Sequence, residues 1–179
     1  MLGFLFYSKM KQLFIVRHAK TELTGFGKSD FSRSLTPSGI HEAKIMAEKL
    51  AEKNIKIDIL LCSSAFRARE TASFLSASVL LDNKMLIHID ELYLATSQLL
   101  NQTIEMLKNS INHVMIIAHN PGITDWVNCM TEQIKIDEMP TCGIFAISSN
   151  VIDWKDFENS KKHFLFFDYP KPHHNIFSK

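Results

Sequence analysis

The 179-residue sequence has little of what would mark a disordered, membrane-spanning or strongly charged protein. Its 6 Gly and 5 Pro are too few for long disordered linkers. Its formal net charge of +1 argues against broad nucleic-acid binding, which needs a basic patch or stripe, but allows a small local cluster of cationic side chains. No run approaches the roughly 20 apolar residues that span a bilayer, so we expect no membrane partner.

Cysteine is also scarce: Cys62, Cys129 and Cys142 are far apart and odd in number. Without a C-x-x-C pair or a disulfide framework, we expect reduced thiols in a cytoplasmic enzyme, each buried as a small hydrophobe. The apolar start of the chain lacks a basic leading region and a small-residue cleavage site, so no signal peptide is expected. We interpret residues 1–10 as an N-terminal extension, with Met1 or Met10 as the native start.

Apolar runs with the length of buried strands alternate with segments of helical periodicity. The runs predict strands at 12–16, 57–62, 85–88, 114–118, 143–148 and 163–167. The periodic segments predict helices at 37–53, 65–77, 97–108 and 121–130, the first with Thr36 as N-cap and Pro37 at its first position. This alternation is typical of a three-layer α/β/α sandwich with a mainly parallel central sheet.

Polar clusters follow three of the predicted strands. Arg17 and His18 come after the first strand, Ser63-Ser64 after the second, and His119-Asn120 after the strand at 114–118. In parallel α/β sheets, ligands bind beyond the carboxyl ends of the strands. We therefore expect these clusters to meet at one edge of the sheet, together with Arg67 near the start of a helix.

These residue types suit a phosphoryl group. Arginine binds its spread negative charge through forked hydrogen bonds, and a neutral histidine can act as a nucleophile that divides hydrolysis into two steps. Because Arg17 and Arg67 disfavour a further positive charge, we expect a lowered pKa and a neutral imidazole for His18 at pH 7. We interpret Ser63 and Ser64 as turn and N-cap residues, because no G-x-S-x-G elbow surrounds them.

The chain resembles the histidine phosphatase superfamily, and within it the small SixA-like phosphohistidine phosphatases. Six segments carry the resemblance in order: Val16-Arg17-His18-Ala19-Lys20, D-x-x-R-S-L-T at 30–36, S-S-x-x-R-A-x-x-T-A at 63–72, A-H-N-P-G at 118–122, and the two closing segments at 139–143 and 167–171. Together they cover roughly residues 11–172, which we interpret as one domain followed by a tail at 173–179. The resemblance implies a phosphoglycerate mutase-like fold.

The chain departs from the usual motifs at three positions. Ala19 and Ala118 stand where Gly is commoner, and Ser34 stands where Pro is usual. None of these changes removes a catalytic side chain, and both Ala residues leave the expected backbone path open.

The resemblance also implies roles for individual residues. His18 would be the residue phosphorylated in the intermediate, with Arg17, Arg67 and His119 completing the phosphate pocket. Glu91 matches a carboxylate that protonates the leaving group in many relatives, although it can equally be an exposed turn acid. Lys20 either reaches the phosphate or solvates its loop. No metal or other cofactor is implied, since the cationic side chains neutralise the phosphoryl charge.

Three functions remain open at this point. The first is a phosphohistidine phosphatase acting on a signalling protein, which fits a chain with no long insertion to form a lid over a small substrate. The second is a phosphatase for a small phosphomonoester, such as a sugar or nucleotide phosphate, for which Glu91 would be essential. The third is a non-catalytic phosphate-binding module. The expected partner is a phosphorylated protein or a small phosphate-containing substrate.

Overall fold

The computed structural model describes residues 10–23, 29–81, 85–132 and 134–170. A six-stranded central sheet has the strand order β5-β3-β6-β1-β7-β8. Its strands are β1 (Lys11–Arg17), β3 (Ile59–Ser63), β5 (Leu86–Ile89), β6 (His113–Ala118), β7 (Ile144–Ser149) and β8 (His163–Asp168). Strands β1, β3, β5 and β6 run parallel, whereas β7 pairs antiparallel with β1 and β8. The short strands β2 (Lys56–Ile57) and β4 (Leu80–Leu81) form a separate pair.

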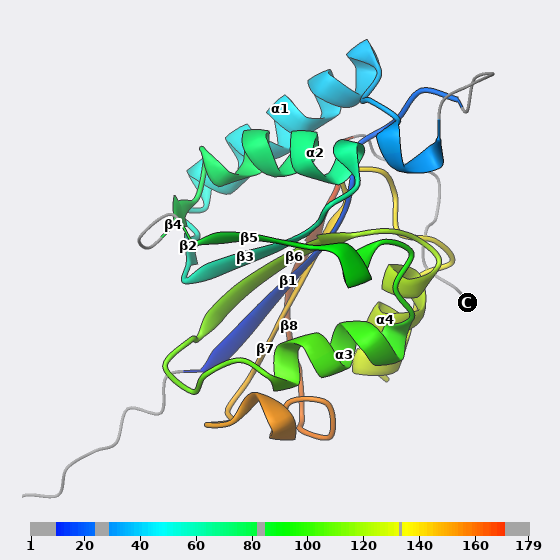
Figure 1. Cartoon of the computed structure of the whole chain (residues 1–179). Coiled ribbons are helices and arrows are strands. Elements are labelled where there is room, and N and C mark those ends of the chain that lie inside the picture. Colours follow the sequence, from blue (N-terminus) through cyan, green and yellow to red (C-terminus); the bar gives the residue numbers. More distant parts are fainter. Residues whose placement is uncertain (1–9, 24–28, 82–84, 133, 171–179) are drawn as a thin grey trace, which may run out of the picture.

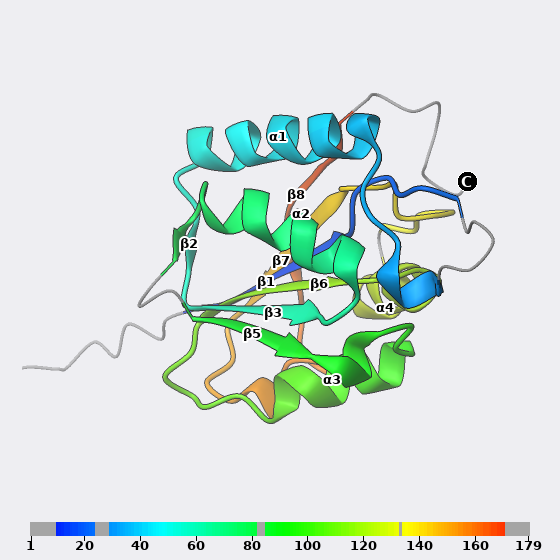
Figure 2. The same ribbon diagram turned by 45° about the horizontal axis from the view of Figure 1, so that its top comes forward.

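Helices cover both faces of this sheet (Figures 1 and 2). Helices α1 (Pro37–Glu52) and α2 (Phe66–Ser76) lie on one face, and α3 (Ser97–Glu105) and α4 (Gly122–Met130) lie on the other. Three short 3-10 turns, η1 (Asp30–Ser32), η3 (Asp90–Leu92) and η4 (Trp154–Asp156), connect these elements. The expected three-layer α/β/α sandwich with a mainly parallel sheet is confirmed. Within the described ranges, no helix combines the length and apolar character needed to cross a membrane.

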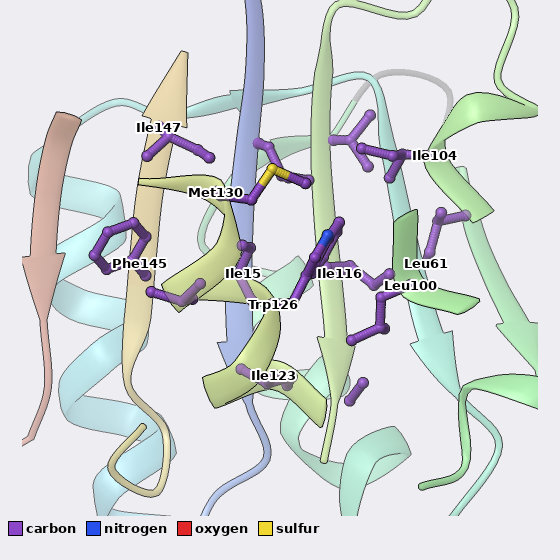
Figure 3. Packing of buried hydrophobic residues seen from close by; sticks show 14 of the residues in the cluster. Ile15, Leu61, Leu100, Ile104, Ile116, Ile123, Trp126, Met130, Phe145 and Ile147 are labelled. Atoms are coloured by element: carbon purple, nitrogen blue, oxygen red, sulfur yellow. The ribbon is translucent and has the colours of Figure 1, made fainter. Parts of the chain in front are cut away.

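The central strands are apolar throughout because both of their faces are buried. In β6, Val114 and Ile116 belong to the hydrophobic cluster beneath α3 and α4, whereas Met115 and Ile117 belong to the cluster beneath α1 and α2. Figure 3 shows the first cluster, in which Trp126 of α4 lies among side chains of the strands. This alternation of faces explains why the sequence of a buried parallel strand reads as a continuous apolar run.

Three local expectations were wrong. The strand expected at 57–62 is divided at Asp58. The Oδ2 of Asp58 accepts hydrogen bonds from the backbone amides of Asn112 (2.7 Å) and His113 (2.9 Å). Helix α3 ends at Glu105 rather than near residue 108, and Cys129 is exposed rather than buried. The proposed extension and tail fall almost entirely on residues 1–9 and 171–179, outside the described residues.

The start of α1 is packed against the backbone that follows His18. Thr36 is the N-cap as expected, its Oγ1 accepting the amide of Gly39 at 3.0 Å, and Pro37 occupies the first helical position. The amide of Lys20 donates to Oε2 of Glu42 in the same helix at 3.0 Å. A Cβ at Gly39 would lie 2.0 Å from the carbonyl oxygen of Lys20. Only glycine therefore allows this approach of the helix to the loop.

The variant Gly39→Ala tests this contact. A methyl group added in the helix interior stabilises by up to about 1 kcal/mol through chain entropy, but here it overlaps a backbone oxygen that cannot move alone. We expect the free energy of unfolding to fall by about 1–3 kcal/mol, as for other overpacked sites. Urea denaturation measures this change. The exposed neighbour Ser38→Ala is the control, and a Gly39→Ala protein as stable as the wild type would contradict the packing described.

Candidate active site

The carboxyl ends of β1, β3 and β6 lie side by side, as the sequence predicted. Arg17 pairs with Ala118 and Cys62 with Ile117 in the strand register, so the residues that follow these strands are neighbours. The amide of His18 donates to the carbonyl of Ala118 at 3.3 Å, which fixes the first polar cluster against the third.

These side chains line a cleft of about 410 Å³. Its lining consists of Arg17, His18, Thr21, Asp30, Arg33, Arg67, Tyr93, Leu94, His119, Asn120 and Thr141. The structure therefore brings together four of the six predicted site residues. A larger hollow of about 760 Å³ lies beside the end of α3, but its described lining contains no histidine or arginine. Chemistry rather than size identifies the cleft as the candidate site.

His18 is held in one tautomer. Its Nδ1 lies 2.8 Å from the carbonyl oxygen of Ala19, which can only accept, so Nδ1 carries the proton. The lone pair of Nε2 then faces the guanidinium of Arg67, whose Nε–H donates to it at 3.2 Å. The side chain of Arg67 is only 2% exposed. A neutral imidazole with an available Nε2 lone pair is the form of histidine that can attack an electrophile.

Burial is the main reason that His18 is neutral. It lowers the pKa of His18 to about 3, while the hydrogen bond to Ala19 opposes the change and the charges of Arg67 and Arg17 add to it. The sequence had attributed the lowering to the arginines alone. Burial likewise lowers the pKa of His119 to about 2, with His18 and Arg67 contributing. The two imidazole rings have centroids 5.0 Å apart, so two neutral histidines lie side by side in the cleft.

Asp30 organises one side of the cleft. Its carboxylate accepts a hydrogen bond from the Tyr93 hydroxyl at 2.6 Å. It also forms ion pairs with Nη2 of Arg67 at 2.9 Å and with Nη2 of Arg33 at 2.6 Å. These contacts, the Tyr93 hydrogen bond first, lower the pKa of Asp30 to about 2. Asp30 is therefore an ionised group that orients two arginines. Sequence reasoning missed its role, as well as those of Arg33 and Tyr93, although the 30–36 motif contains two of the three.

Arg17 is held from the other side of the cleft. Its Nη1 donates to Oε1 of Glu138 at 2.7 Å and to the carbonyl oxygen of Met139 at 2.6 Å. Asn120 donates to the same two acceptors at 3.1 and 3.0 Å. The buried Nε of Arg17 has no hydrogen-bond partner among the described residues. The segment after α4 thus orients Arg17 and leaves one of its donors available.

Two predicted site residues are not brought into the cleft. Glu91 is exposed on η3 and does not belong to the cleft lining, whereas Tyr93 from the same turn does. Lys20 is exposed as well, and only its backbone is fixed, by Glu42 and Thr36. A catalytic role for either side chain stays a prediction.

The two substitutions of Ala for Gly fit the backbone without strain. Ala19 and Ala118 are fully buried, and neither is among the described non-glycine residues with a positive φ, which are Asn54, Leu94 and Cys142. The expectation that both alanines leave the backbone path open is confirmed.

Neutral, buried histidines make stability depend on pH. The unfolded chain takes up protons near the ordinary histidine pKa of 6.5, whereas the folded protein does so only near pH 3 or below. The contribution of these two neutral histidines to the free energy of unfolding is therefore fully present above about pH 6.5 and is lost as the pH falls toward 3. We expect the variant His18→Gln to lose less unfolding free energy than the wild type between pH 7 and pH 5, as measured by urea denaturation. An NMR titration showing His18 protonated at pH 7 would contradict this account.

Comparison with known proteins agrees with this fold. A SixA protein from Agrobacterium tumefaciens is 25% identical, with a TM-score of 0.74 over 89% of this chain and 99% of that one. The protein histidine phosphatase SixA complexed with tungstate is 24% identical, with a TM-score of 0.74 over 89% and 97%. These neighbours confirm the phosphoglycerate mutase-like fold that the resemblance implied.

Sequence relatives extend the comparison. An uncharacterized protein from Mycobacterium leprae is 27% identical over 169 residues, 87% of this chain and all of that protein. A 66-residue segment is 35% identical to the mitochondrial serine/threonine-protein phosphatase PGAM5 of Xenopus laevis, over 37% of this chain and 23% of that protein. The family profile of the histidine phosphatase superfamily (branch 1) matches residues 13–105. The chain therefore belongs to the histidine phosphatase superfamily.

Proposed function

We propose that this phosphatase transfers a phosphoryl group to Nε2 of His18 and then to water, with phosphohistidine in a protein as its preferred substrate. One observation carries the proposal: His18 is buried and neutral, with Nδ1 bound to the Ala19 carbonyl and the Nε2 lone pair beside Arg67. Two further arginines, Arg17 and Arg33, line the same cleft. A tetrahedral oxyanion fits such a cleft, and a solved SixA neighbour is complexed with tungstate.

The reaction has two displacements. First, the Nε2 lone pair attacks phosphorus while the bond to the leaving group breaks, and the leaving group departs with that electron pair. The Arg67 Nε–H, which donates to Nε2 in the free enzyme, then has a phosphoryl oxygen as its acceptor. Second, water attacks phosphorus and the P–N bond breaks, with its electron pair returning to Nε2. Inorganic phosphate is released, and His18 is neutral again. Throughout, the arginines stabilise charge on the phosphoryl oxygens, which is the main catalytic requirement of such transfers.

The cleft favours substrates with good leaving groups. Asp30 is the only carboxylate in its described lining, and a pKa of about 2 keeps Asp30 ionised at neutral pH. It therefore has no proton to give to a leaving group. An imidazole can depart without help from an acid when its second nitrogen carries a proton, whereas a sugar alkoxide needs a proton donor. This contrast favours phosphohistidine over an alkyl phosphate.

A second candidate, hydrolysis of a phosphomonoester, rests on a different observation. A 66-residue segment of this chain is similar to PGAM5, and PGAM5 is a serine/threonine-protein phosphatase, a class of enzyme whose substrates are phosphate esters. Such a reaction would require Glu91 or another acid to approach the cleft. The third candidate, a non-catalytic phosphate-binding module, would use the same arginines but form no phosphoenzyme. A cytoplasmic location stays a prediction from the scattered cysteines.

Trapping the intermediate tests the proposal. Wild-type protein mixed with a ³²P-phosphohistidine protein and quenched in base should carry an acid-labile label on His18. The variant His18→Asn should carry none and should lose activity by roughly 10³-fold or more, as enzymes do without their nucleophile. The exposed His41→Asn on α1 is the matched control and should label normally.

The same assay separates the remaining alternatives. Labelling should persist in EDTA, because we expect the arginines rather than a metal ion to neutralise the phosphoryl charge. Loss of activity in EDTA that Mg²⁺ restores would contradict the metal-independent mechanism. Phosphate binding without any label would favour the non-catalytic module.

The variant Glu91→Gln discriminates between the two substrate classes. If phosphohistidine is the substrate, kcat/KM should change by less than about twofold, because the exposed carboxylate lies outside the cleft lining. If a sugar phosphate is the substrate, loss of the general acid should lower kcat by about 10²-fold or more. Steady-state kinetics on both substrates measures this. The neighbouring exposed acid Asp90→Asn controls for the change of charge on η3.

A further inference from the structure

Ser63 is the one serine whose hydroxyl contacts a histidine of the cleft among the described residues. It is the last residue of β3 and is fully buried. Its Oγ lies 2.8 Å from Nε2 of His119 and accepts the amide of Ala65 at 3.3 Å. The sequence had suggested a turn or N-cap role for this serine. The bond from the Ala65 amide fits the turn role, whereas the N-cap of α2 is Ala65, with no side-chain cap. The turn uses the hydroxyl only as an acceptor, so its proton has a separate partner.

The opposite nitrogen of His119, Nδ1, is buried and makes no hydrogen bond to any of the described residues. His119 lines the cleft, is only 2% exposed, and lies against His18 and Tyr93, with ring centroids 5.0 and 5.5 Å away. Because buried polar atoms in native proteins nearly always have partners, an unpaired nitrogen in a phosphate cleft points to a ligand as the missing one.

We propose that Ser63 is a positioning residue that sets the tautomer of His119. Its hydroxyl donates to Nε2, which keeps the proton on Nδ1, and this Nδ1–H donates to an oxygen of the phosphoryl group during transfer. The second half of this inference rests on the proposed function, whereas the tautomer itself does not.

The hydrogen-bonding capacities of the two groups support this direction. Burial keeps His119 neutral, so only one of its nitrogens carries a proton. If Nε2–H donated to Ser63, the serine hydroxyl proton would have no acceptor among the described residues, since His119 is the only candidate. The lone pair of Nδ1 would then also face the lone pairs of a phosphoryl oxygen. If Ser63 donates instead, the hydroxyl is satisfied and Nδ1–H is available to the substrate.

The two histidines of the cleft would then share one tautomer for opposite purposes. The Ala19 carbonyl holds the proton on Nδ1 of His18, so Nε2 carries the lone pair, which attacks phosphorus once the Arg67 Nε–H donates to a phosphoryl oxygen instead. Ser63 holds the proton on Nδ1 of His119, so that this nitrogen is a donor. Two residues of the same type thus have different functions because their neighbours differ. The accepting Ala19 carbonyl makes His18 a nucleophile, and the donating Ser63 hydroxyl makes His119 a neutral hydrogen-bond donor.

The tautomer can be measured without any substrate. In ¹⁵N-histidine-labelled wild-type protein at pH 7, we expect a proton-bearing shift for Nδ1 of His119 and an unprotonated shift for Nε2. The resonances that disappear in His119→Asn assign this residue among the eight histidines of the chain. A proton on Nε2 in the wild type would overturn the proposal, even if no serine variant could be prepared.

Kinetics of Ser63→Ala test the functional half. Without the hydroxyl, the Nδ1–H form is no longer favoured, and the Nδ1 shift should move toward the unprotonated value. We expect kcat on the phosphohistidine protein to fall by roughly tenfold to a hundredfold, comparable to the loss when the hydrogen-bond partner of a metal-bound histidine is removed, with a smaller change in KM. The neighbouring Ser64→Ala, whose side chain is outside the cleft lining, should leave both the shift and kcat unchanged.

Two outcomes would separate this inference from the proposed function. A wild-type tautomer as expected, with unchanged kcat in Ser63→Ala, would overturn the catalytic use of Nδ1–H while leaving the phosphoenzyme intact. Failure to label His18 would overturn the proposed function, and the NMR result would still decide which group donates between Ser63 and His119.

Discussion

Parallel pairing of β1 with β6, and of β6 with β3, is the constraint on which the site depends. Each of these strands is buried on both faces, so hydrophobic packing on two sides holds them in register. The chain can then leave the sheet only at the strand ends, where backbone groups become available to loops. Parallel strands end on the same edge, and this brings residues about fifty and a hundred positions apart in the sequence into one cleft. The chemistry at that edge is thus a consequence of core packing.

Charge balance in the cleft follows from the same packing. Three arginines converge there, and two carboxylates orient them: Asp30 pairs with Arg33 and Arg67, and Glu138 pairs with Arg17. Burial keeps both histidines neutral, so they add no positive charge. The cleft consequently keeps an excess of positive charge that a phosphoryl group can neutralise. The same burial, which makes a charged histidine costly, would strengthen a contact between the Arg67 guanidinium, which is 2% exposed, and a phosphoryl group.

Most of the elements could be predicted because their signals are local. Continuous apolar runs identified the buried strands, and Thr36 with Pro37 marked the start of α1. The departures came from contacts between distant segments. Asp58 divides an apolar run because its carboxylate caps the amides of Asn112 and His113, which no local pattern reveals. Similarly, the close approach of Gly39 to Lys20 depends on where α1 lies relative to the loop after His18.

The sequence by itself determined the fold class, the family and the residues that form the centre of the cleft, because the alternation of strands and helices, the order of the motifs along the chain and the residue chemistry can all be read from the sequence. The tertiary structure alone decided how those residues are used. It showed that burial, more than the arginines, lowers the pKa of His18, and that Asp30, Arg33 and Tyr93 complete the cleft. It also placed the Ser63 hydroxyl on His119 and left Glu91 outside the lining. Hydrogen-bond direction and desolvation depend on three-dimensional neighbours, which linear spacing does not encode.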